Sequence, residues 1–283
     1  MRLSHGLICL VMGLCVGSPQ ARAQVTSSII DEFGDSIGDI TDVLFPGVTN
    51  IRLGLGPAIS PDYEGADNYD IKPLPLLSFR YKDLIEVDNN HLRVNLFGLN
   101  SLVRKKHFRA GPQIRVDFGR DEDDNPDLSG LGNIGTSVEL GVFGSYTVGP
   151  ARARIRVLHD VAGGHSGTKV IGDVRWVLLK TDRLAVSGSA STTWADNTYM
   201  DEFFGINTAQ ALASGLPSFN AGAGLKDAGI SVVANYKLSR HWALLGNVEY
   251  KRLLGDAGDS PIVSTRGSAD QAAAGVFVIY SFH

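Results

Sequence analysis

The sequence predicts an all-β protein, a transmembrane antiparallel up-and-down β-barrel of about twelve strands. Three observations lead to this prediction. Apolar residues alternate with polar or small residues along many segments of ten or more residues, as in strands with one face toward lipid. Short and long connections alternate along most of the chain. Beyond the N-terminal leader no run of about 18 apolar residues occurs, which excludes helical membrane spans.

The first 23 residues have the form of a cleaved secretory signal peptide. Arg2 provides a basic start, an apolar run follows over 7–16, and 21–23 (Ala-Arg-Ala) matches the pattern that signal peptidase cuts. Ten apolar residues are too few to cross a membrane core of about 30 Å as a helix. Both cysteines, Cys9 and Cys15, lie in this segment, so the mature chain is expected to have no disulfide or thiol chemistry.

Residues 24–49 are predicted to form a periplasmic segment before the barrel, which occupies 50–283. In this segment apolar residues recur at helical spacing with acidic residues between them. Such a helix could dock an envelope enzyme or enter the barrel lumen. Gly34 and Gly38 weaken it, so a short helix or a frayed tail without a partner is the alternative.

Each predicted strand places apolar residues outward and polar or small residues inward. In the first strand, Ile51 and Leu53 flank Arg52. The third and fourth strands are the weakest predictions, because the third is short and only Asn89-Asn90 marks a turn between them. Ten strands is therefore the alternative. The predicted strands are 51–60, 71–82, 84–89, 91–97, 107–119, 134–148, 150–160, 168–180, 183–194, 228–238, 241–252 and 271–282.

The strand over 150–160 alternates most sharply, and its arginines need water or carboxylates beside them. Facing the lumen, such charges could line a solute path, as charge rings do in channels. They could also form a salt-bridge network that fills a narrow barrel. We favour filling, because twelve strands lie between packed small barrels and open porins. The predicted lumen charges are Arg115, Asp117, Glu139, Arg152, Arg154, Arg156, Asp173, Arg175 and Glu249.

Short connections are expected on the periplasmic side and long ones outside. The acidic run 121–127 then lies outside, where it could hold divalent cations against lipopolysaccharide; a mobile, solvated loop is the favoured interpretation. The stretch 195–227 is too long for an idle connector and could fold into the mouth or offer an external contact site. The candidate loop residues are His165, Trp194, Asp196, Tyr199, Phe204, Gly215, Pro217, Lys226 and Asp227.

Enzymatic function is not predicted. His159, Asp160, His165 and Ser166 could supply a base and a nucleophile at the end of one strand, but no nucleophile motif accompanies them. Two histidines without a third ligand do not predict a metal site, and no cofactor is expected. A net charge of −4, with no basic cluster interleaved with aromatics beyond the short run 104–106, argues against a nucleic-acid partner.

Several motifs resemble the MipA/OmpV family of outer-membrane proteins, in order and over roughly residues 50 to 282. The resemblance implies a Gram-negative outer-membrane barrel in contact with lipid and lipopolysaccharide. For some members it also implies a scaffold that joins a murein-cleaving lytic transglycosylase to a murein synthase; other members are linked to osmotic or antimicrobial response and to adhesion. The motifs are Pro61-Asp62-Tyr63-Glu64-Gly65, Lys72-Pro73-Leu74-Pro75, Gly163-Gly164-His165-Ser166-Gly167, Trp194-Ala195-Asp196, Phe204-Gly205-Ile206, Ser214-Gly215-Leu216-Pro217, Gly222-Ala223-Gly224-Leu225-Lys226-Asp227 and Leu253-Leu254-Gly255-Asp256.

We therefore predict an outer-membrane barrel that acts as a non-enzymatic scaffold or receptor for enzymes of peptidoglycan metabolism. The alternative is a narrow solute channel, and a surface hydrolase is the third hypothesis.

Overall fold

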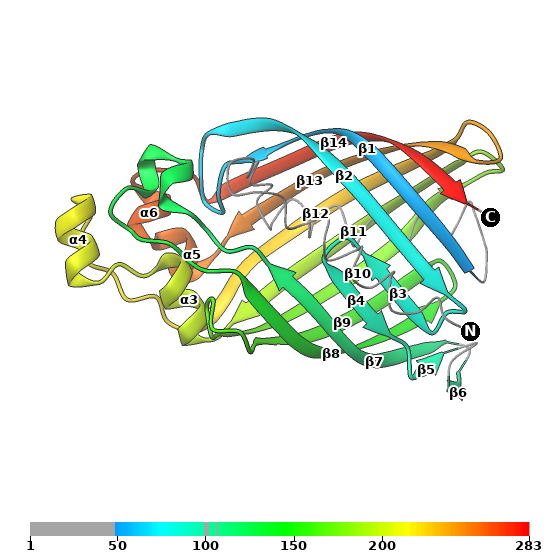
Figure 1. The fold of residues 1–283 in the computed structure, drawn as a ribbon, viewed down its shortest axis with the longest axis horizontal. Helices are drawn as coiled ribbons and strands as arrows, with labels where there is room; N and C mark the ends of the chain where they lie inside the picture. The colour runs from blue at the N-terminus through cyan, green and yellow to red at the C-terminus, as the bar shows by residue number, and fades with distance from the viewer. Residues whose placement is uncertain (1–48, 99–101, 106, 283) are drawn as a thin grey trace, which may run out of the picture.

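The computed structural model describes residues 49–98, 102–105 and 107–282 (Figure 1). The predicted signal peptide, the predicted helical segment up to residue 48 and His283 lie outside the described residues. The described part forms one sheet of fourteen strands, and twelve of them close into an antiparallel barrel, as predicted. No described helix is long and apolar enough to cross a membrane.

Consecutive strands of the ring are neighbours, which is the up-and-down topology. The ring closes where β1 pairs with β14, with Ile51 opposite Phe282, and where β4 pairs with β7. The two-residue strand β5 (Phe97–Gly98) continues β4 along β7, with Phe97 opposite Ala110, and β6 (Val103–Arg104) pairs with β5. The ring strands are β1 (Thr49–Pro61), β2 (Tyr69–Tyr81), β3 (Ile85–Asp88), β4 (His91–Val94), β7 (Phe108–Asp117), β8 (Ser137–Val148), β9 (Ala151–Asp160), β10 (Thr168–Lys180), β11 (Leu184–Ala195), β12 (Gly224–Lys237), β13 (Trp242–Leu253) and β14 (Asp270–Phe282).

The period-two alternation sets the two faces of the wall as predicted. In β9, Ile155 is 55% exposed on the outer face, whereas Arg154 and Arg156 are buried on the inner face. Aromatic side chains remain exposed near both ends of the strands, including Trp176 and Trp194. This distribution is the pair of interfacial girdles expected of a membrane barrel.

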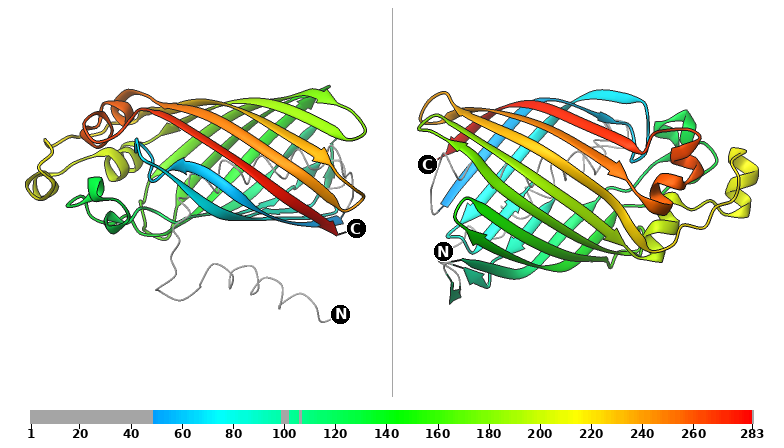
Figure 2. Two further views of the ribbon diagram at one scale, coloured as in Figure 1. Left: turned by 90° about the horizontal axis from the view of Figure 1, so that it is seen from above. Right: turned by 180° about the vertical axis from the view of Figure 1, so that it is seen from behind.

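Short turns gather at one end of the barrel, here called the short-turn end. Lys82 and Asp83, between β2 and β3, both have positive φ, at 49° and 58°. That conformation is the two-residue hairpin turn whose twist matches the strands. Long connections gather at the opposite, long-loop end (Figures 1 and 2).

The long connections are folded, which differs from the solvated loop expected at 121–127, whereas 195–227 was expected either to fold into the mouth or to offer an external contact site. Two short helices, α3 and α4, lie in the connection between β11 and β12, and two more lie between β13 and β14. They bury two apolar clusters, one around Met200 and Phe204 and one around Leu128 and Ile262. The elements are η1 (Glu122–Asp124), η2 (Pro126–Leu128), α3 (Asn197–Phe204), α4 (Thr208–Ser214), α5 (Gly255–Asp259) and α6 (Pro261–Ser264).

The inner face of the wall is not polar all round, which corrects the expectation of polar or small residues there. Leu76, Phe277 and Ile279 are buried inward-facing members of one apolar cluster. Glycines of β1 make room for them: a Cβ on Gly54 would lie 2.6 Å from Ile279 Cδ1, and one on Gly56 would lie 2.7 Å from Phe277 Cα.

The strands β3 and β4 have four residues each, shorter than predicted for 84–89 and 91–97. The Asn95 side chain donates a hydrogen bond of 2.7 Å to Asp83 O, and this contact ties the end of β4 to the turn below. The hairpin therefore closes the wall only near the short-turn end (Figure 1).

Candidate functional site

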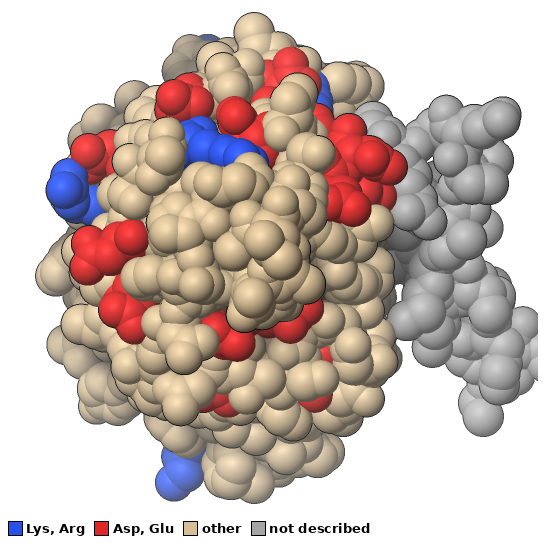
Figure 3. Space-filling view, turned by 90° about the vertical axis from the view of Figure 1, so that its left-hand side faces the viewer, with Lys and Arg blue, Asp and Glu red and all other residues tan. Residues whose placement is uncertain are grey.

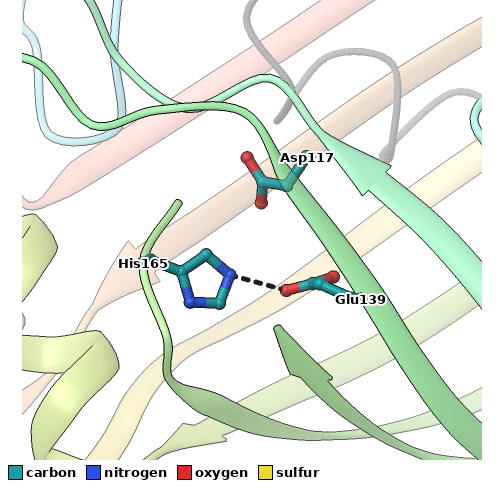
Figure 4. A group of neighbouring side chains, drawn as sticks. All are labelled: Asp117, Glu139 and His165. Atoms are coloured by element: carbon teal, nitrogen blue, oxygen red, sulfur yellow. Dashed lines mark hydrogen bonds and ion pairs between the residues drawn. The ribbon is translucent and has the colours of Figure 1, made fainter. Parts of the chain in front are cut away.

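Three buried side chains converge inside the barrel near the long-loop end: Asp117 of β7, Glu139 of β8 and His165 of the β9–β10 connection (Figure 4). Their potential ligand atoms all lie within 4.8 Å of one another. Asp117 and Glu139 were predicted as lumen charges and His165 as a loop residue. The structure brings them together because the connection folds back over the end of β8.

Local hydrogen bonds fix the position of His165. Its backbone N–H donates to Asp160 Oδ2 at 2.9 Å and to Ser137 Oγ at 3.1 Å. The Gly167 N–H donates to Nδ1 of the ring at 3.0 Å, so Nδ1 carries no proton. Nε2 then carries the proton and donates to Glu139 Oε1 at 2.9 Å. Both ring nitrogens are thus engaged.

Two cations lie beside the carboxylates of this cluster. The Lys169 ammonium is 2.9 Å from Glu139 Oε1 and 3.4 Å from Asp117 Oδ2. Arg115 lies 3.3 Å from Glu139 and 3.4 Å from Asp117. A metal ion would need the place that the ammonium takes, and its charge would face two cations. The cluster is therefore better suited to an ion-pair network than to a metal centre.

The hydrolase hypothesis finds no matching geometry among the described residues. His159 points outward and bonds Thr168 Oγ1 at 3.1 Å, whereas His165 points inward. The ring of His165 contacts Gly167 and Glu139, not the hydroxyl of Ser166. A base without a hydroxyl nucleophile in reach does not support acyl transfer.

A second ionic cluster ties the β1–β2 connection to β12 and β13 at the mouth of the barrel. Glu64 accepts hydrogen bonds from Lys226, and from Lys251 at 3.1 Å. Lys226 is also 2.8 Å from Asp227. Burial alone would raise the pKa of Glu64, but the two ammonium groups outweigh it and hold that pKa below its ordinary value.

A bulge explains why Lys226 and Asp227 are both buried although they are adjacent. The pairing of β11 with β12 shifts between Thr193–Asp227 and Trp194–Leu225, so Lys226 is an extra residue on β12. Bulges redirect side chains in this way. The sequence placed the start of this strand at 228, and the strand in fact begins at Gly224.

Tyr199 of α3 lies between the two clusters. Its ring stacks on Phe203, with centroids 4.5 Å apart, and meets His165 edge-on at 4.9 Å. The ammonium of Lys169 lies 4.8 Å from its centroid, and that of Lys226 lies 5.9 Å away. Burial raises the pKa of Tyr199 well above its ordinary value, so the phenol stays neutral.

Hydrogen bonds donated to the Asp196 carboxylate hold α3 over the mouth. Its carboxylate caps the helix by accepting from Tyr199 N at 2.9 Å, and it accepts from Thr168 N at 2.9 Å. Burial would raise its pKa, but these backbone donors lower it. Phe204 is buried, and Ser260 Oγ donates to its carbonyl at 2.6 Å.

The remaining predicted loop residues do not join this site. Trp194 is 40% exposed on the outer surface. Gly215 ends α4 in the left-handed conformation, with φ +76°, and Pro217 is exposed beyond it. The sequence did not lead us to place Glu64, Lys169 or Lys251 in a site. Lys169 and Lys251 do stand at inward-facing positions of the alternating pattern, and this could have indicated that they lie inside the barrel.

The other predicted lumen charges face inward as well. Arg154 Nε lies 2.9 Å from Asp173 Oδ1, and Arg156 lies 3.3 Å from the same oxygen. Arg175 is buried on the same wall, and Arg152 is partly buried. Glu249 lines a small pocket beside Glu64 and Lys251. Its water-accessible volume of about 10 Å³ is at the lower limit for one water molecule.

The acidic run 121–127 is ordered by its own carboxylates. Asp121 caps η1, and Glu122 Oε2 accepts from Gly130 N and Gly132 N at 2.9 and 3.0 Å. Asn125 Nδ2 donates to Asp62 Oδ2 at 2.9 Å, which joins this connection to the β1–β2 connection. The structure therefore corrects the interpretation of 121–127 as a mobile, solvated loop.

The two ends of the barrel carry opposite charge. Acidic side chains gather around the face at the long-loop end, with few basic ones among them (Figure 3). At the short-turn end the exposed charges are mostly basic, and Asp182 is an exposed acid among them. We call the exposed basic residues of the short-turn end the basic rim: Lys82, Arg104, Lys105, Lys180, Arg183 and Arg240.

The chain is similar to several known proteins. The KdgM porin structure is 9% identical with a TM-score of 0.40, covering 82% of this chain and 99% of that one. The NanC porin structure is 10% identical with a TM-score of 0.41, covering 82% and 98%. "Putative outer membrane protein YiaT" of Escherichia coli (strain K12) is 20% identical over 226 residues, covering 78% of this chain and 87% of the relative. The family model described as "MltA-interacting protein MipA" matches residues 53–282.

Proposed function

Since the chain belongs to the MltA-interacting protein MipA family, we propose that this outer-membrane barrel is a non-enzymatic scaffold that holds peptidoglycan enzymes at its periplasmic face. The short-turn end faces the periplasm in outer-membrane barrels. The basic rim is therefore the surface offered to periplasmic partners.

The observation that carries this proposal is the contrast between the closed long-loop end and the charged short-turn end. At the long-loop end, α3 and its two ionic clusters fill the mouth with buried side chains such as Tyr199 and Phe204. At the short-turn end, basic side chains project from several separate turns. A partner with an acidic surface would be attracted to such a rim, and charge complementarity speeds its association.

The experiment measures binding of a purified lytic transglycosylase and of a murein synthase to the immobilised full-length barrel. Reversing Lys82, Arg183 and Arg240 to Glu is expected to weaken binding by about tenfold, mainly through slower association that is sensitive to salt. The matched control reverses Asp67, Asp201 and Asp259 to Lys at the other end, where binding should be unchanged. No binding by the wild-type barrel, or equal loss in both variants, would reject the scaffold.

A narrow channel for anions is the second candidate, and one observation favours it. Arg152, Arg154, Arg156 and Arg175 face the lumen on adjacent strands, with Asp173 between them. Such a wall would prefer anions. Steady anion-selective current in a planar bilayer, lost in Arg154→Glu, would support the channel, whereas a folded but silent barrel would support a filled lumen.

A further inference from the structure

The lumen of the barrel has two walls of different chemistry. On one side, four arginines of β9 and β10 face inward around Asp173, whose carboxylate lies 2.9 Å from Arg154 and 3.3 Å from Arg156. On the other side, inward-facing apolar residues of β14, β1 and β2 belong to one buried cluster. We call the first set the arginine wall (Arg152, Arg154, Arg156 and Arg175) and the second set the apolar wall (Ala58, Leu74, Leu76, Ala273, Phe277 and Ile279).

The two walls face each other across the ring. β1 stands six places from β9 in the ring of twelve strands, and β2 stands six places from β10. Twelve strands about 4.8 Å apart and tilted by about 40° enclose about 24 Å between opposite backbones. Side chains of the two walls cover part of this width and leave room for one α-helix, which is about 10–12 Å across. Leu76 and Phe277 are 2% and 0% exposed although they face the lumen, so the apolar wall is not open to water.

The chain carries a segment with the same two chemistries directly before β1. Residues 24–48, which lie outside the described residues, contain five acids and no lysine or arginine. At about 100° per residue, the acids and the apolar residues of a helix over 29–44 fall on opposite faces. The acidic face consists of Asp31, Asp35, Asp39 and Asp42, and the apolar face consists of Ile30, Phe33, Ile37, Ile40 and Leu44.

The position and the length of this segment fit the lumen. β1 begins at Thr49 at the short-turn end, opposite Tyr81 of β2. Pro46 and Gly47 favour the end of a helix and a turn, so the chain can fold back between the strands. A helix over 29–44 would be about 24 Å long, close to the height of about 25 Å of the apolar band around such a barrel.

Charge and apolar surface together select this segment as the occupant of the lumen. The sequence left open whether it captures a partner, enters the lumen or does neither. We propose that residues 29–44 lie along the lumen as a helix, with the acidic face on the arginine wall and the apolar face on the apolar wall. Buried arginines need carboxylates beside them, and packing on both faces offsets the helix-weakening effect of Gly34 and Gly38. This assignment is independent of the scaffold proposal, which uses the basic rim.

Photo-crosslinking of the full-length protein in the outer membrane tests where the segment lies. A benzophenone amino acid takes the place of Phe33, one aromatic side chain for another, and mass spectrometry maps the residues that it reaches. Crosslinks should fall on the inner faces of β14, β1 and β2. The same probe in place of Asp39 should mark β9 and β10 instead. Crosslinks to another protein, or the same crosslinks from both positions, would overturn the proposal.

Charge reversal tests the pairing with the arginine wall. In the triple variant Asp35→Lys/Asp39→Lys/Asp42→Lys the segment should leave the lumen, because its lysines would face arginines. Anion-selective current in a planar bilayer should then rise above that of the wild type. Adding Arg154→Glu and Arg156→Glu restores opposite charges and should return the current to the wild-type level.

The matched control reverses three acids at the long-loop end, Asp67, Asp201 and Asp259, to Lys and should leave the current unchanged. Equal currents in the wild type and in the triple variant of the segment would contradict the proposal. If the triple variant does not fold, the crosslinks decide, since they require no change of charge at Phe33.

Discussion

Lys226 donates a hydrogen bond to Glu64, a residue 162 positions earlier in the chain. This contact joins β12 to the β1–β2 connection at the mouth of the barrel, past β13 and β14. Lys251 of β13 reaches the same carboxylate at 3.1 Å, so one acidic side chain ties three segments together. The closed state of the mouth therefore depends on a small number of charges.

Replacing Glu64 with Gln should destabilise the folded mouth. The change leaves two ammonium groups beside a neutral side chain, and breaking a buried ion pair costs about 3 kcal/mol. We take the lower end of the range because 14% of the Glu64 side chain stays exposed. Thermal unfolding of the purified barrel measures the change. Asp270→Asn is the control, since the Arg252–Asp270 pair is 56% and 50% exposed and should leave the melting temperature unchanged.

Acid should loosen the mouth. The pKa values of Glu64 and Asp196 are lowered in the folded state, so their stabilisation is fully present above the ordinary values of about 4.3 and 3.9 and is lost as the pH falls through the lowered values. Unfolding followed from pH 7 down to pH 2 should show a decline that starts near pH 4. The decline should be shallower in Glu64→Gln, and identical curves for the two proteins would contradict this assignment.

Removing Lys169 should create a metal site. Lys169→Ala takes away one of the two cations beside Asp117 and Glu139 and leaves Arg115 as the other, so the two carboxylates and His165, whose potential ligand atoms lie within 4.8 Å of one another, can close around a zinc ion. Calorimetry should detect one Zn²⁺ bound per Lys169→Ala barrel and none at this position in the wild type. Adding His165→Ala should abolish the new binding; if it does not, the zinc lies elsewhere.

Tyr199→Ala should open the mouth, whereas Tyr199→Phe should not. The ring supplies the stacking on Phe203 and the contacts to Lys169, and both survive in Phe. Loss of a buried aromatic ring costs about 3–5 kcal/mol. Single-channel recording tests the effect: the Ala variant should pass more current than the wild type, and the Phe variant should match the wild type.

Period-two alternation predicted faces correctly but could not predict neighbours. It placed Arg154 inside and Ile155 outside, because lipid demands apolar residues and the lumen tolerates charge. Along 271–282 it placed Val276 on the outer face with Tyr280 and Phe282, and the structure exposes Val276 and buries Phe277. It failed at the bulge of Lys226, where an extra residue breaks the period.

The cluster of buried ionisable side chains at the mouth could not be predicted from the sequence, for a different reason. Asp117, Glu139 and His165 were each recognised, but their convergence depends on how the β9–β10 connection folds onto β8 through Ser137 and Asp160. Glu64 and Lys251, 187 positions apart, meet only once the ring has closed. Spacing along one chain contains no information on such contacts.

The pairing of β1 with β14 joins Ile51 to Phe282, residues from opposite ends of the barrel sequence. Their hydrogen bonds cannot form until the last strand has been synthesised, so the contact order of this step is nearly that of the whole domain, and such long-range pairing is slow. Until then the nascent chain is a curved sheet with two unpaired edge strands, and each edge can pair with a strand of another chain. The two edge strands must therefore be kept from pairing with other chains until β14 is available. A chain truncated before β14 would be expected to aggregate rather than insert.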